Sequence, residues 1–375
     1  MPALSGRNPP GLINRLVLEN LKHRRLRTLL SALSIGFQVT MILTVVGISR
    51  GMLEDSVTRA RGVGADVWIK PPGASAISLS GASMPVKILD YFRKQPHVTQ
   101  AAGTLVIPIG GISTVTGIEI DEFTALSGKF KFVAGGPFQS PDDLIIDDWY
   151  AEQSKKKVGD SVSILNHDYR VSGIVEAGKL ARLFVPLDTL QNLTGNTGKI
   201  SQAYLKLDDP ENTGAVIAAL KQNLDDYTIL SIEEFVSMFN VNNIPGLQAF
   251  IYVIIGLSII IGFLVVGLTM YTSVLERTRE IGILKALGAS PPDILSIIVR
   301  ETLLLALGGW LAGLALSYAA HATINGLIRA NLQSVIVVDW WPIALLIAVV
   351  ASLLGAVYPG LRAARQDAIE ALAYE

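Results

Sequence analysis

The segment ERTREIGILKALGAS occupies residues 276–290 and stands directly between two long uncharged runs of the chain. Its mixture of charged and apolar residues favours a helix. Gly288 and the pair Pro291-Pro292 end that helix, because glycine suits a helix C-terminus and proline cannot continue it. The pattern predicts a short, rigid helix at a membrane face, where a membrane protein meets a cytoplasmic partner. The alternative is an ordinary loop whose charges only set the orientation of the neighbouring spans in the membrane.

Four uncharged runs dominate the chain, which has 375 residues, is 50% hydrophobic and only 17% charged. The runs are residues 29–48, 246–275, 302–320 and 340–361. Each reaches or approaches the roughly 20 apolar residues that a helix needs to cross a bilayer. Buried helices of a soluble protein are the alternative, but they seldom stay uncharged for so long. We therefore expect an α-helical membrane protein with four transmembrane helices.

Positive charges indicate the orientation of these helices. Residues 1–27 carry a net charge of +5, and the loop after the second run holds three further cations. The loop between the third and fourth runs holds only Arg329. Because cytoplasmic loops are enriched in Lys and Arg, both termini and residues 276–293 should be cytoplasmic, and residues 51–247 should lie outside. The first run is too long for a signal peptide, so it reads as an uncleaved anchor.

Several residues within the runs are of interest for helix packing. Gly309 and Gly313 form a small-xxx-small pair that lets two helices approach closely. Gln38 is a candidate for a hydrogen bond between helices. Arg300 and Glu301 are costly in lipid, so they should snorkel to the interface or pair, either across a dimer or with the 276–290 segment.

The outer segment, residues 51–247, is long enough to form a packed domain. It holds 17 Lys and Arg against 23 Asp and Glu, a mildly acidic balance that gives no sign of a nucleic-acid surface. The chain has no cysteine, so this domain must fold without disulfides. Some local patterns alternate as in β-strands and others have the apolar spacing of helices, so they predict an α+β domain of two lobes. The expected strands are residues 65–70, 113–120, 169–175 and 203–207, and the expected helices are 85–95 and 213–223.

Chemistry-bearing residues form no recognisable catalytic or metal site. The four histidines are scattered without metal-ligand spacing. Asp pairs such as Asp147-Asp148 and Asp208-Asp209 are better explained as turn caps than as ligands. The sequence also lacks a phosphate-binding G-x-x-x-x-G-K-[ST] loop. We therefore expect a non-enzymatic chain without a cofactor of its own, and any nucleotide hydrolysis would have to be done by another polypeptide.

Three stretches give the chain a resemblance to the MacB/FtsX-type ABC transporter permeases, also called mechanotransmission or type VII permeases. The first is Asn20-Leu21-Lys22 with Arg27-Thr28-Leu29-Leu30, which resembles the family's basic elbow before span one. The second, Glu276-Arg277-Thr278-Arg279-Glu280-Ile281-Gly282 with Lys285-Ala286-Leu287-Gly288-Ala289, closely matches its coupling segment. The third joins Pro359 and Arg362-Ala363-Ala364-Arg365 to Ile369-Glu370-Ala371-Leu372. Asp367-Ala368 departs from the family, where many members carry an acidic residue before proline.

The resemblance implies a domain plan. Residues 1–50 would be the amphipathic elbow and first span, residues 51–247 a MacB-like periplasmic domain, and residues 248–375 an FtsX-like permease domain. The chain would be a multi-pass protein of the bacterial cytoplasmic (inner) membrane. The residues implied to couple it to an ATPase are Glu276, Arg277, Arg279, Glu280, Lys285, Ala286, Leu287, Gly288, Ala289 and Ser290.

The resemblance also implies partners and a function. The partners would be an ABC ATPase subunit, a second permease copy or a paralogue, membrane lipids, and a periplasmic adaptor with an outer-membrane protein. The expected function is relay of ATP-driven motion to the outer domain for export or extraction of a lipoprotein, lipid, peptide or amphiphilic drug. The alternative is an FtsX-like signalling subunit that activates a cell-wall hydrolase.

The topology can be tested because the chain has no cysteine. Single substitutions Ser80→Cys, Lys156→Cys, Ser290→Cys and Ala373→Cys are probed with an impermeant thiol reagent in intact cells with a permeabilised outer barrier. We expect labelling at positions 80 and 156 and protection at 290 and 373. Labelling at 290 without labelling at 156 would overturn the orientation.

Overall fold

The computed structural model describes residues 25–73, 82–110, 113–244, 246–328 and 332–365. Contacts divide the chain into two compact units. The helical unit contains residues up to Ile48, 248–323 and those from Val335 on, and the sheet unit contains residues 49–247 and 324–334. Five features named above lie outside the described residues: the Asn20-Leu21-Lys22 motif, the labelling positions Ser80 and Ala373, Arg329, the Asp367-Ala368 departure, and the motif at 369–372.

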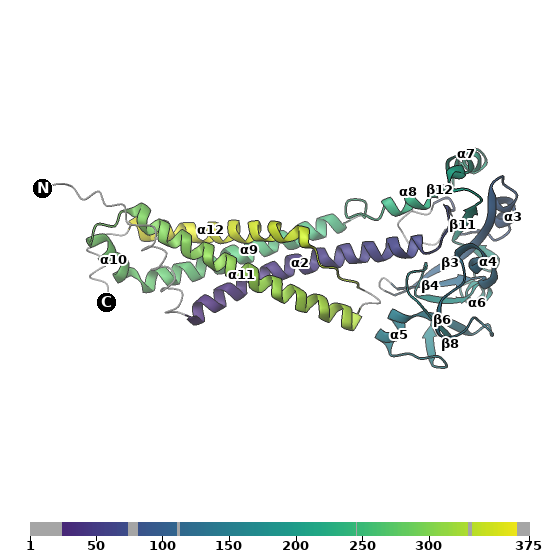
Figure 1. Ribbon diagram of the computed structural model, residues 1–375, viewed down its shortest axis with the longest axis horizontal. Helices are drawn as coiled ribbons and strands as arrows, with labels where there is room; N and C mark the ends of the chain where they lie inside the picture. The colour runs from purple at the N-terminus through teal and green to yellow at the C-terminus, as the bar shows by residue number, and fades with distance from the viewer. Residues whose placement is uncertain (1–24, 74–81, 111–112, 245, 329–331, 366–375) are drawn as a thin grey trace. The chain divides into compact units, whose positions relative to one another are not determined.

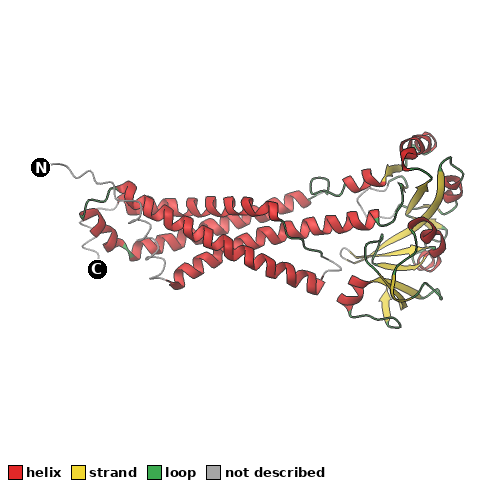
Figure 2. Cartoon of the chain, viewed as in Figure 1, coloured by secondary structure: helices red, strands yellow, loops and turns green. Residues whose placement is uncertain are grey.

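The helical unit is built from long helices (Figures 1 and 2). Its elements are α2 (Arg25–Arg61, of which residues from Ser49 on belong to the sheet unit), α9 (Leu247–Glu276), α10 (Thr278–Ala286), α11 (Pro291–Ile328), η2 (Val338–Trp340) and α12 (Trp341–Arg365). Four of the described helices, α2, α9, α11 and the stretch ending in α12, are long and apolar enough to cross a membrane. The four expected spans are therefore confirmed as helices. They extend past the uncharged runs, because charged residues outside a bilayer need not end a helix.

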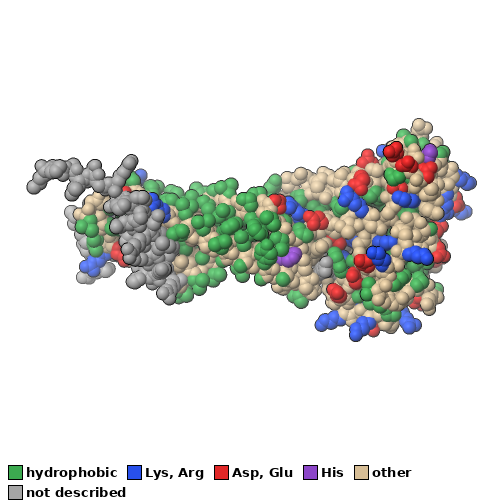
Figure 3. Space-filling view, in the orientation of Figure 1, with side chains coloured by type: hydrophobic (Ala, Val, Ile, Leu, Met, Phe, Trp, Pro, Cys, Tyr) green, Lys and Arg blue, Asp and Glu red, His purple; other side chains and the backbone are tan. Residues whose placement is uncertain are grey.

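The exterior of the helical unit is apolar. On the face shown in Figure 3, hydrophobic side chains cover much of the helical unit, whereas Lys, Arg, Asp and Glu are frequent on the sheet unit. On α9, Leu264 is 59% exposed and Leu268 is 68% exposed. Side chains of this kind would be costly in water but favourable against lipid tails, as expected for a membrane span.

Small residues bring α2 and α11 into close contact. A Cβ placed on Gly309 would lie 2.6 Å from the Ile35 Cβ, and one on Gly313 would lie 2.7 Å from the carbonyl oxygen of Gly36. The Thr40 hydroxyl adds a hydrogen bond of 3.1 Å to the Gly313 carbonyl. The expected small-xxx-small contact is confirmed, because only glycine leaves room for the backbones to approach this closely.

The Gln38 side chain does not form the contact that was expected of it. Its side chain is buried against Gly262 of α9, but neither its amide oxygen nor its amide nitrogen has a hydrogen-bond partner among the described residues. The expected hydrogen bond between helices is therefore not formed. The facing position is a glycine, which gives the amide space but no side-chain partner.

The sheet unit contains a ten-stranded mixed sheet in the order β12-β1-β11-β3-β4-β9-β6-β8-β5, with β7 also paired to β8. Its strands are β1 (Val67–Lys70), β3 (Val98–Gly110), β4 (Ser113–Ile118), β5 (Phe132–Gly135), β6 (Asp143–Asp147), β7 (Ser161–Ile164), β8 (His167–Val175), β9 (Leu183–Pro186), β11 (Gln202–Leu207) and β12 (Thr228–Ser231). A two-stranded sheet joins β2 (Met84–Pro85) to β10 (Lys199–Ile200). The helices are α3 (Ile88–Arg93), α4 (Ile120–Ser127), α5 (Asp148–Ser154), α6 (Leu187–Leu193), η1 (Pro210–Asn212), α7 (Thr213–Asn223) and α8 (Ile232–Ser237).

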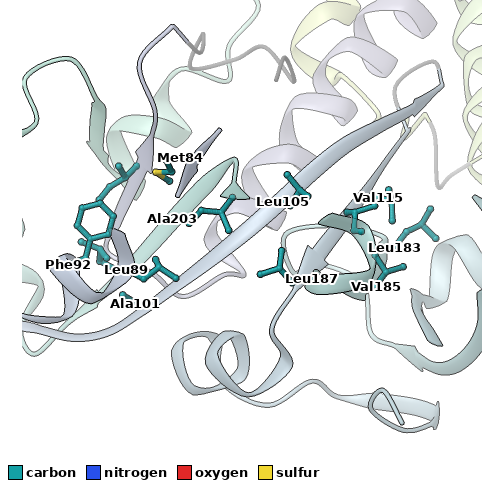
Figure 4. Packing of buried hydrophobic residues seen from close by; sticks show 14 of the residues in the cluster. Met84, Leu89, Phe92, Ala101, Leu105, Val115, Leu183, Val185, Leu187 and Ala203 are labelled. Atoms are coloured by element: carbon teal, nitrogen blue, oxygen red, sulfur yellow. The ribbon is translucent and has the colours of Figure 1, made fainter. Parts of the chain in front are cut away.

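Alternation along the strands gives this sheet two separate buried faces. In β1, Val67 and Ile69 join one cluster, while Trp68 between them joins the other. The same alternation occurs in β9, where Leu183 and Val185 lie in the first cluster, part of which Figure 4 shows. Since successive side chains of a strand point to opposite faces, both faces of the sheet are packed.

The local predictions for this unit hold in part. Each expected strand and helix overlaps an observed one, and the helix at 213–223 is confirmed at both ends. The two-lobe expectation is wrong, because residues 49–247 form one compact unit with a continuous sheet. The Asp pairs do cap turns: Asp147 accepts the Tyr150 amide at the start of α5, and Asp209 accepts the Glu211 amide at η1.

A charge network fixes the last turns of α2 within the sheet unit. Arg182 donates to Asp55 of α2 at 2.8 Å and to Asp147 at 2.7 Å, and its guanidinium lies 4.9 Å from the centre of the Trp149 ring. Arg59 forms an ion pair with the same Asp55 carboxylate at 3.1 Å. All four charged side chains are mostly shielded from water, so each relies on the others for compensation.

The contact between α2 and α11 can be tested with two adjacent glycines. Gly309→Ala should destabilise the protein by about 1–3 kcal/mol, because the added methyl has no space against Ile35 and Ala32. Gly308→Ala is the matched control, since a Cβ there meets nothing within 4 Å. Thermal unfolding in detergent measures both. Equal melting temperatures for the two variants would contradict the close contact.

Candidate coupling site

The segment predicted to couple the protein to an ATPase begins at a break between two helices. Helix α9 ends at Glu276 and α10 starts at Thr278, so Arg277 alone separates them. The Arg277 backbone leaves the helical region with φ −107° and ψ 14°. Its carbonyl accepts the Ile281 amide at 2.9 Å, which starts the new helix. Helix α10 is therefore attached directly to the end of α9.

The Arg277 side chain lies inside the unit and forms a buried ion pair. Its Nη2 donates to Glu301 Oε2 of α11 at 2.6 Å and to the Ser273 hydroxyl of α9 at 3.0 Å. The two charged side chains are only 10% and 8% exposed. The expected pairing of Glu301 with the coupling segment is thus observed within one chain. A buried pair of this kind is hard to break, because either charge alone would be left without compensation.

The end of α10 is fixed by backbone hydrogen bonds. The Ala289 amide donates to the Leu284 carbonyl, and the Gly288 amide donates to the Lys285 carbonyl, each at 2.9 Å. Gly288 has φ +98°, which favours glycine, so the pattern is a Schellman C-cap. The helix end predicted at Gly288 is confirmed.

The start of α11 follows directly. Asp293 Oδ2 accepts the Ser290 amide at 2.9 Å and the Ser290 hydroxyl at 2.6 Å, with Pro291 in the first helical turn. These bonds satisfy helix-terminal groups that would otherwise lack partners. The connection between α10 and α11 is therefore short and ordered.

A contact with α12 completes the attachment of α10. Lys285 Nζ donates to the Ala364 carbonyl at 2.8 Å, close to the C-terminal end of α12. Near it, Arg362 donates to the Tyr271 hydroxyl of α9 at 2.9 Å, and its guanidinium lies 5.5 Å from the centre of that ring. Cations suit the end of a helix, where carbonyl groups are unsatisfied. Helix α10 thus contacts α9, α11 and α12.

One side of the segment is exposed. Leu287 is 81% exposed and Ile283, one turn earlier, is 46% exposed. Residues four apart lie on the same side of a helix, so these two form a small apolar face. Arg279 and Glu280 are exposed as well and add one charge of each sign. This combination suits contact with another protein surface.

An apolar cavity of about 270 Å³ lies beside α10. Its lining comes from the end of α9, from α10 and from the first turns of α11. The residues are Val274, Arg277, Glu280, Ile281, Ile283, Leu284, Ile294, Ile297 and Ile298. The packing between α10 and α11 is therefore incomplete on this side.

The structure thus separates the predicted site residues into two groups. Arg277 is buried and Lys285 is partly buried, and both bond within the chain. The other group is exposed or half-exposed and can face a partner: Glu276, Arg279, Glu280, Ala286, Leu287, Gly288, Ala289 and Ser290. Ser273 and Asp293 were not predicted, because a serine in a span and an aspartate after two prolines carry no distinctive signal.

The histidines lie apart from one another in the part of the chain that the structure describes. No group of three or more His, Asp or Glu residues there could hold a metal ion. His97 and His167 each bond a neighbouring aspartate on the surface of the sheet unit, at 3.0 and 2.8 Å. Asn212 bonds both members of the His97–Asp208 pair, so these contacts are small surface hydrogen-bond groups.

Two domain families match this chain in agreement with this architecture. The MacB-like periplasmic core domain matches residues 28–223, and the FtsX-like permease C-terminal domain matches residues 252–368. The chain is 22% identical over 395 aligned positions to the macrolide export ATP-binding/permease protein MacB of Escherichia coli, covering 96% of this chain and 60% of that protein. It is 29% identical over 232 positions to the uncharacterized ABC transporter permease MJ1507 of Methanocaldococcus jannaschii, covering 58% of this chain and 57% of that protein. The periplasmic region of MacB from Actinobacillus actinomycetemcomitans aligns with 50% of this chain and 97% of its own, at 17% identity and a TM-score of 0.37.

The fold and these matches define a membrane protein with four spanning helices and a large α+β domain after the first. The chain belongs to the MacB/FtsX-type family of ABC transporter permeases, as its motifs suggested. It is a multi-pass protein of the cytoplasmic membrane, in a family whose permease components are generally non-catalytic. It spans about 60% of the length of the relatives it matches.

The buried ion pair can be tested by removing one charge or both. Glu301→Gln should destabilise the protein by about 3–5 kcal/mol, because it leaves the Arg277 charge buried and uncompensated. The double variant Arg277→Met/Glu301→Leu should recover most of this loss, since neither charge remains.

The control is Glu176→Gln, which removes an exposed ion pair of 3.1 Å with Lys131 and should change stability by less than about 1 kcal/mol. Unfolding of the full-length protein in detergent measures all three. If the double variant is as unstable as Glu301→Gln, the loss of stability does not come from the uncompensated charge of Arg277.

Proposed function

We propose that this chain is the permease subunit of an ABC transporter complex and relays ATP-driven motion to its sheet unit. ATP and Mg would be bound by a separate ATPase, and helix α10 would receive the motion. The work done outside would be export or extraction of a lipoprotein, lipid, peptide or amphiphilic drug. The observation that carries the proposal is the attachment of α10 to three spans while its other face is exposed.

The attachments make α10 suitable as a relay. It follows α9 after one residue, and the Arg277–Glu301 ion pair and the Lys285–Ala364 hydrogen bond connect it to α11 and α12. Its own ends are held by a C-cap and by the Ser290–Asp293 bonds. A displacement of α10 would therefore be passed to the spans, because no flexible linker separates it from them.

The exposed face of α10 suits docking on an ATPase. Leu287 and Ile283 supply an apolar contact, and Glu280 and Arg279 supply charges around it. An apolar centre with a polar rim is the common composition of a protein interface. Two permease chains, or this chain and a paralogue, would sit on a pair of such ATPases, with the segment 276–290 on the cytoplasmic side.

The match to the MacB-like periplasmic core domain favours the transport function over the hydrolase-activating alternative. In this proposal the sheet unit faces the periplasm and contacts an adaptor, an outer-membrane protein or the cargo itself. The curated relative MacB carries the words macrolide export in its name, which fits the amphiphilic-drug class among the proposed cargoes.

Variants of α10 test the coupling. Leu287→Asp and Glu280→Arg change exposed side chains, so the spans should still insert and the sheet unit should still fold. Gly288→Pro should distort the helix end, because proline requires φ near −65° where this residue has φ +98°. We expect each variant to lose most of the stimulation of the partner ATPase and of transport.

The measurement uses reconstituted complexes with the ATPase that co-purifies with the wild-type chain. Leu193→Asp is the matched control, since Leu193 is an exposed leucine of the sheet unit and should leave coupling unchanged. Wild-type ATPase stimulation and transport in both Leu287→Asp and Glu280→Arg would refute the coupling assignment.

A further inference from the structure

The apolar cavity beside α10, of about 270 Å³, has no role in the coupling proposed above. Its walls come from the end of α9, from α10 and from the first turns of α11. Seven of its nine lining residues are Val, Leu or Ile. Because such a lining gives water few hydrogen-bond partners, the cavity suits the apolar part of a ligand better than it suits water.

The inner wall of the cavity is buried and held in place. Ile294 and Ile298 of α11 are only 2% and 4% exposed. The Arg277–Glu301 ion pair joins the start of α10 to α11, and the cap at Gly288 fixes the other end of α10. These contacts form without a ligand, so the cavity exists before binding. Binding to a preformed site loses little free energy to reorganisation of the protein.

The outer edge of the cavity carries one negative charge in excess. Ile283 is 46% exposed and Glu280 is exposed as well, and both line the cavity. The other charged lining residue is Arg277, whose charge is balanced by Glu301 at 2.6 Å. Among the described residues, the Glu280 carboxylate has no ion-pair partner. An apolar cavity with a carboxylate at its edge is complementary to an apolar molecule that carries a cation at one end.

We propose that this cavity binds a small amphiphilic amine, with an ammonium group on an aromatic or branched alkyl body. The body would lie between α10 and α11 against Ile281, Ile294 and Ile298, and the ammonium would lie at the edge beside Glu280. The volume allows this, because a protein cavity of ~150 Å³ already holds one benzene molecule and this cavity is larger.

The bound amine would act on the coupling segment. It would cover parts of Ile283 and Glu280, which also belong to the exposed face proposed for docking on the ATPase. An amine in the cavity would therefore compete with the ATPase and lower its stimulation. This consequence rests on the proposed function, whereas the binding itself does not.

The test measures binding of fluorinated probes to the full-length chain in phosphatidylcholine nanodiscs by ¹⁹F NMR, without the ATPase. The cationic probe is (6-fluoronaphthalen-2-yl)methylamine, and its neutral and anionic counterparts are (6-fluoronaphthalen-2-yl)methanol and 6-fluoro-2-naphthoate. Empty nanodiscs correct for partition into lipid. We expect saturable binding of the amine, with the alcohol weaker by about fivefold, as one ion pair that is open to water on one side contributes. The naphthoate should bind more weakly still.

Two variants locate the ligand in the cavity. Ile297→Trp fills the cavity from α11 and should weaken amine binding by roughly tenfold or more, because the indole takes the space of the ligand body. Glu280→Lys should reverse the charge preference, so that the naphthoate binds more tightly than the amine. Glu152→Lys is the matched control, since Glu152 is an exposed carboxylate of the sheet unit that does not line the cavity. It should leave the binding of all three probes unchanged.

Three results would overturn the proposal: no saturable binding of the amine, equal binding of the naphthoate, or unchanged amine binding in a folded Ile297→Trp variant. Should Ile297→Trp fail to fold by circular dichroism, the charge preference of the wild-type chain and of Glu280→Lys decides. A failure of the coupling proposal would leave this result unaffected, because the measurement involves neither ATPase stimulation nor transport.

Discussion

The helical unit depends on one buried charge pair, Arg277 with Glu301. Two opposite charges that are both shielded from water stabilise a structure only while they remain together, since separation exposes each to a large desolvation cost. Arg277 lies where α9 ends and α10 begins, and its partner Glu301 lies more than two helical turns after the start of α11. The pair therefore fixes the direction in which α10 leaves the membrane helices. The Lys285 contact with α12 and the exposure of Leu287 are consistent with that direction.

Packing elsewhere in the helical unit uses a different principle. Between α2 and α11, and again where Gly267 of α9 meets Gly355 of α12, backbones approach closely because a side chain is missing. Between lipid-facing helices there is little hydrophobic drive, so van der Waals contact at small residues stabilises association. The sheet unit, by contrast, is held by large buried side chains such as Trp68, Phe123 and Tyr169 on the two faces of one sheet. The helical unit is thus packed in a way that suits lipid, and the sheet unit is packed in a way that suits water.

Sequence patterns predicted the parts of this fold that depend on local periodicity. The four spans, the helix end at Gly288 and the strand around Tyr169 follow from hydrophobic runs, a terminal glycine and alternation, each of which acts within a few residues. Contacts between residues far apart in the sequence were harder to predict. Glu301 was expected to snorkel or to pair, but the sequence left its partner open between a second chain and the segment 276–290. The single continuous sheet was missed because its order depends on contacts between residues far apart, such as β1 with β12.

The position of β1 in the sheet has a consequence for how the chain is made. Val67, in the first strand of the sheet unit, pairs with Leu205 and with Ser231, which follow it by 138 and 164 residues. Arg182 likewise reaches back 127 residues to Asp55. Contacts of such long range form slowly, because the entropy of closing a long loop must be overcome first. After the first span has inserted, β1 must therefore wait unpaired, with the apolar residues Val67, Trp68 and Ile69 exposed, until synthesis has passed β11, and its other edge stays open until synthesis has passed β12. During that interval the nascent chain is vulnerable to aggregation and proteolysis and is a natural client for chaperones on the side of the membrane where it emerges.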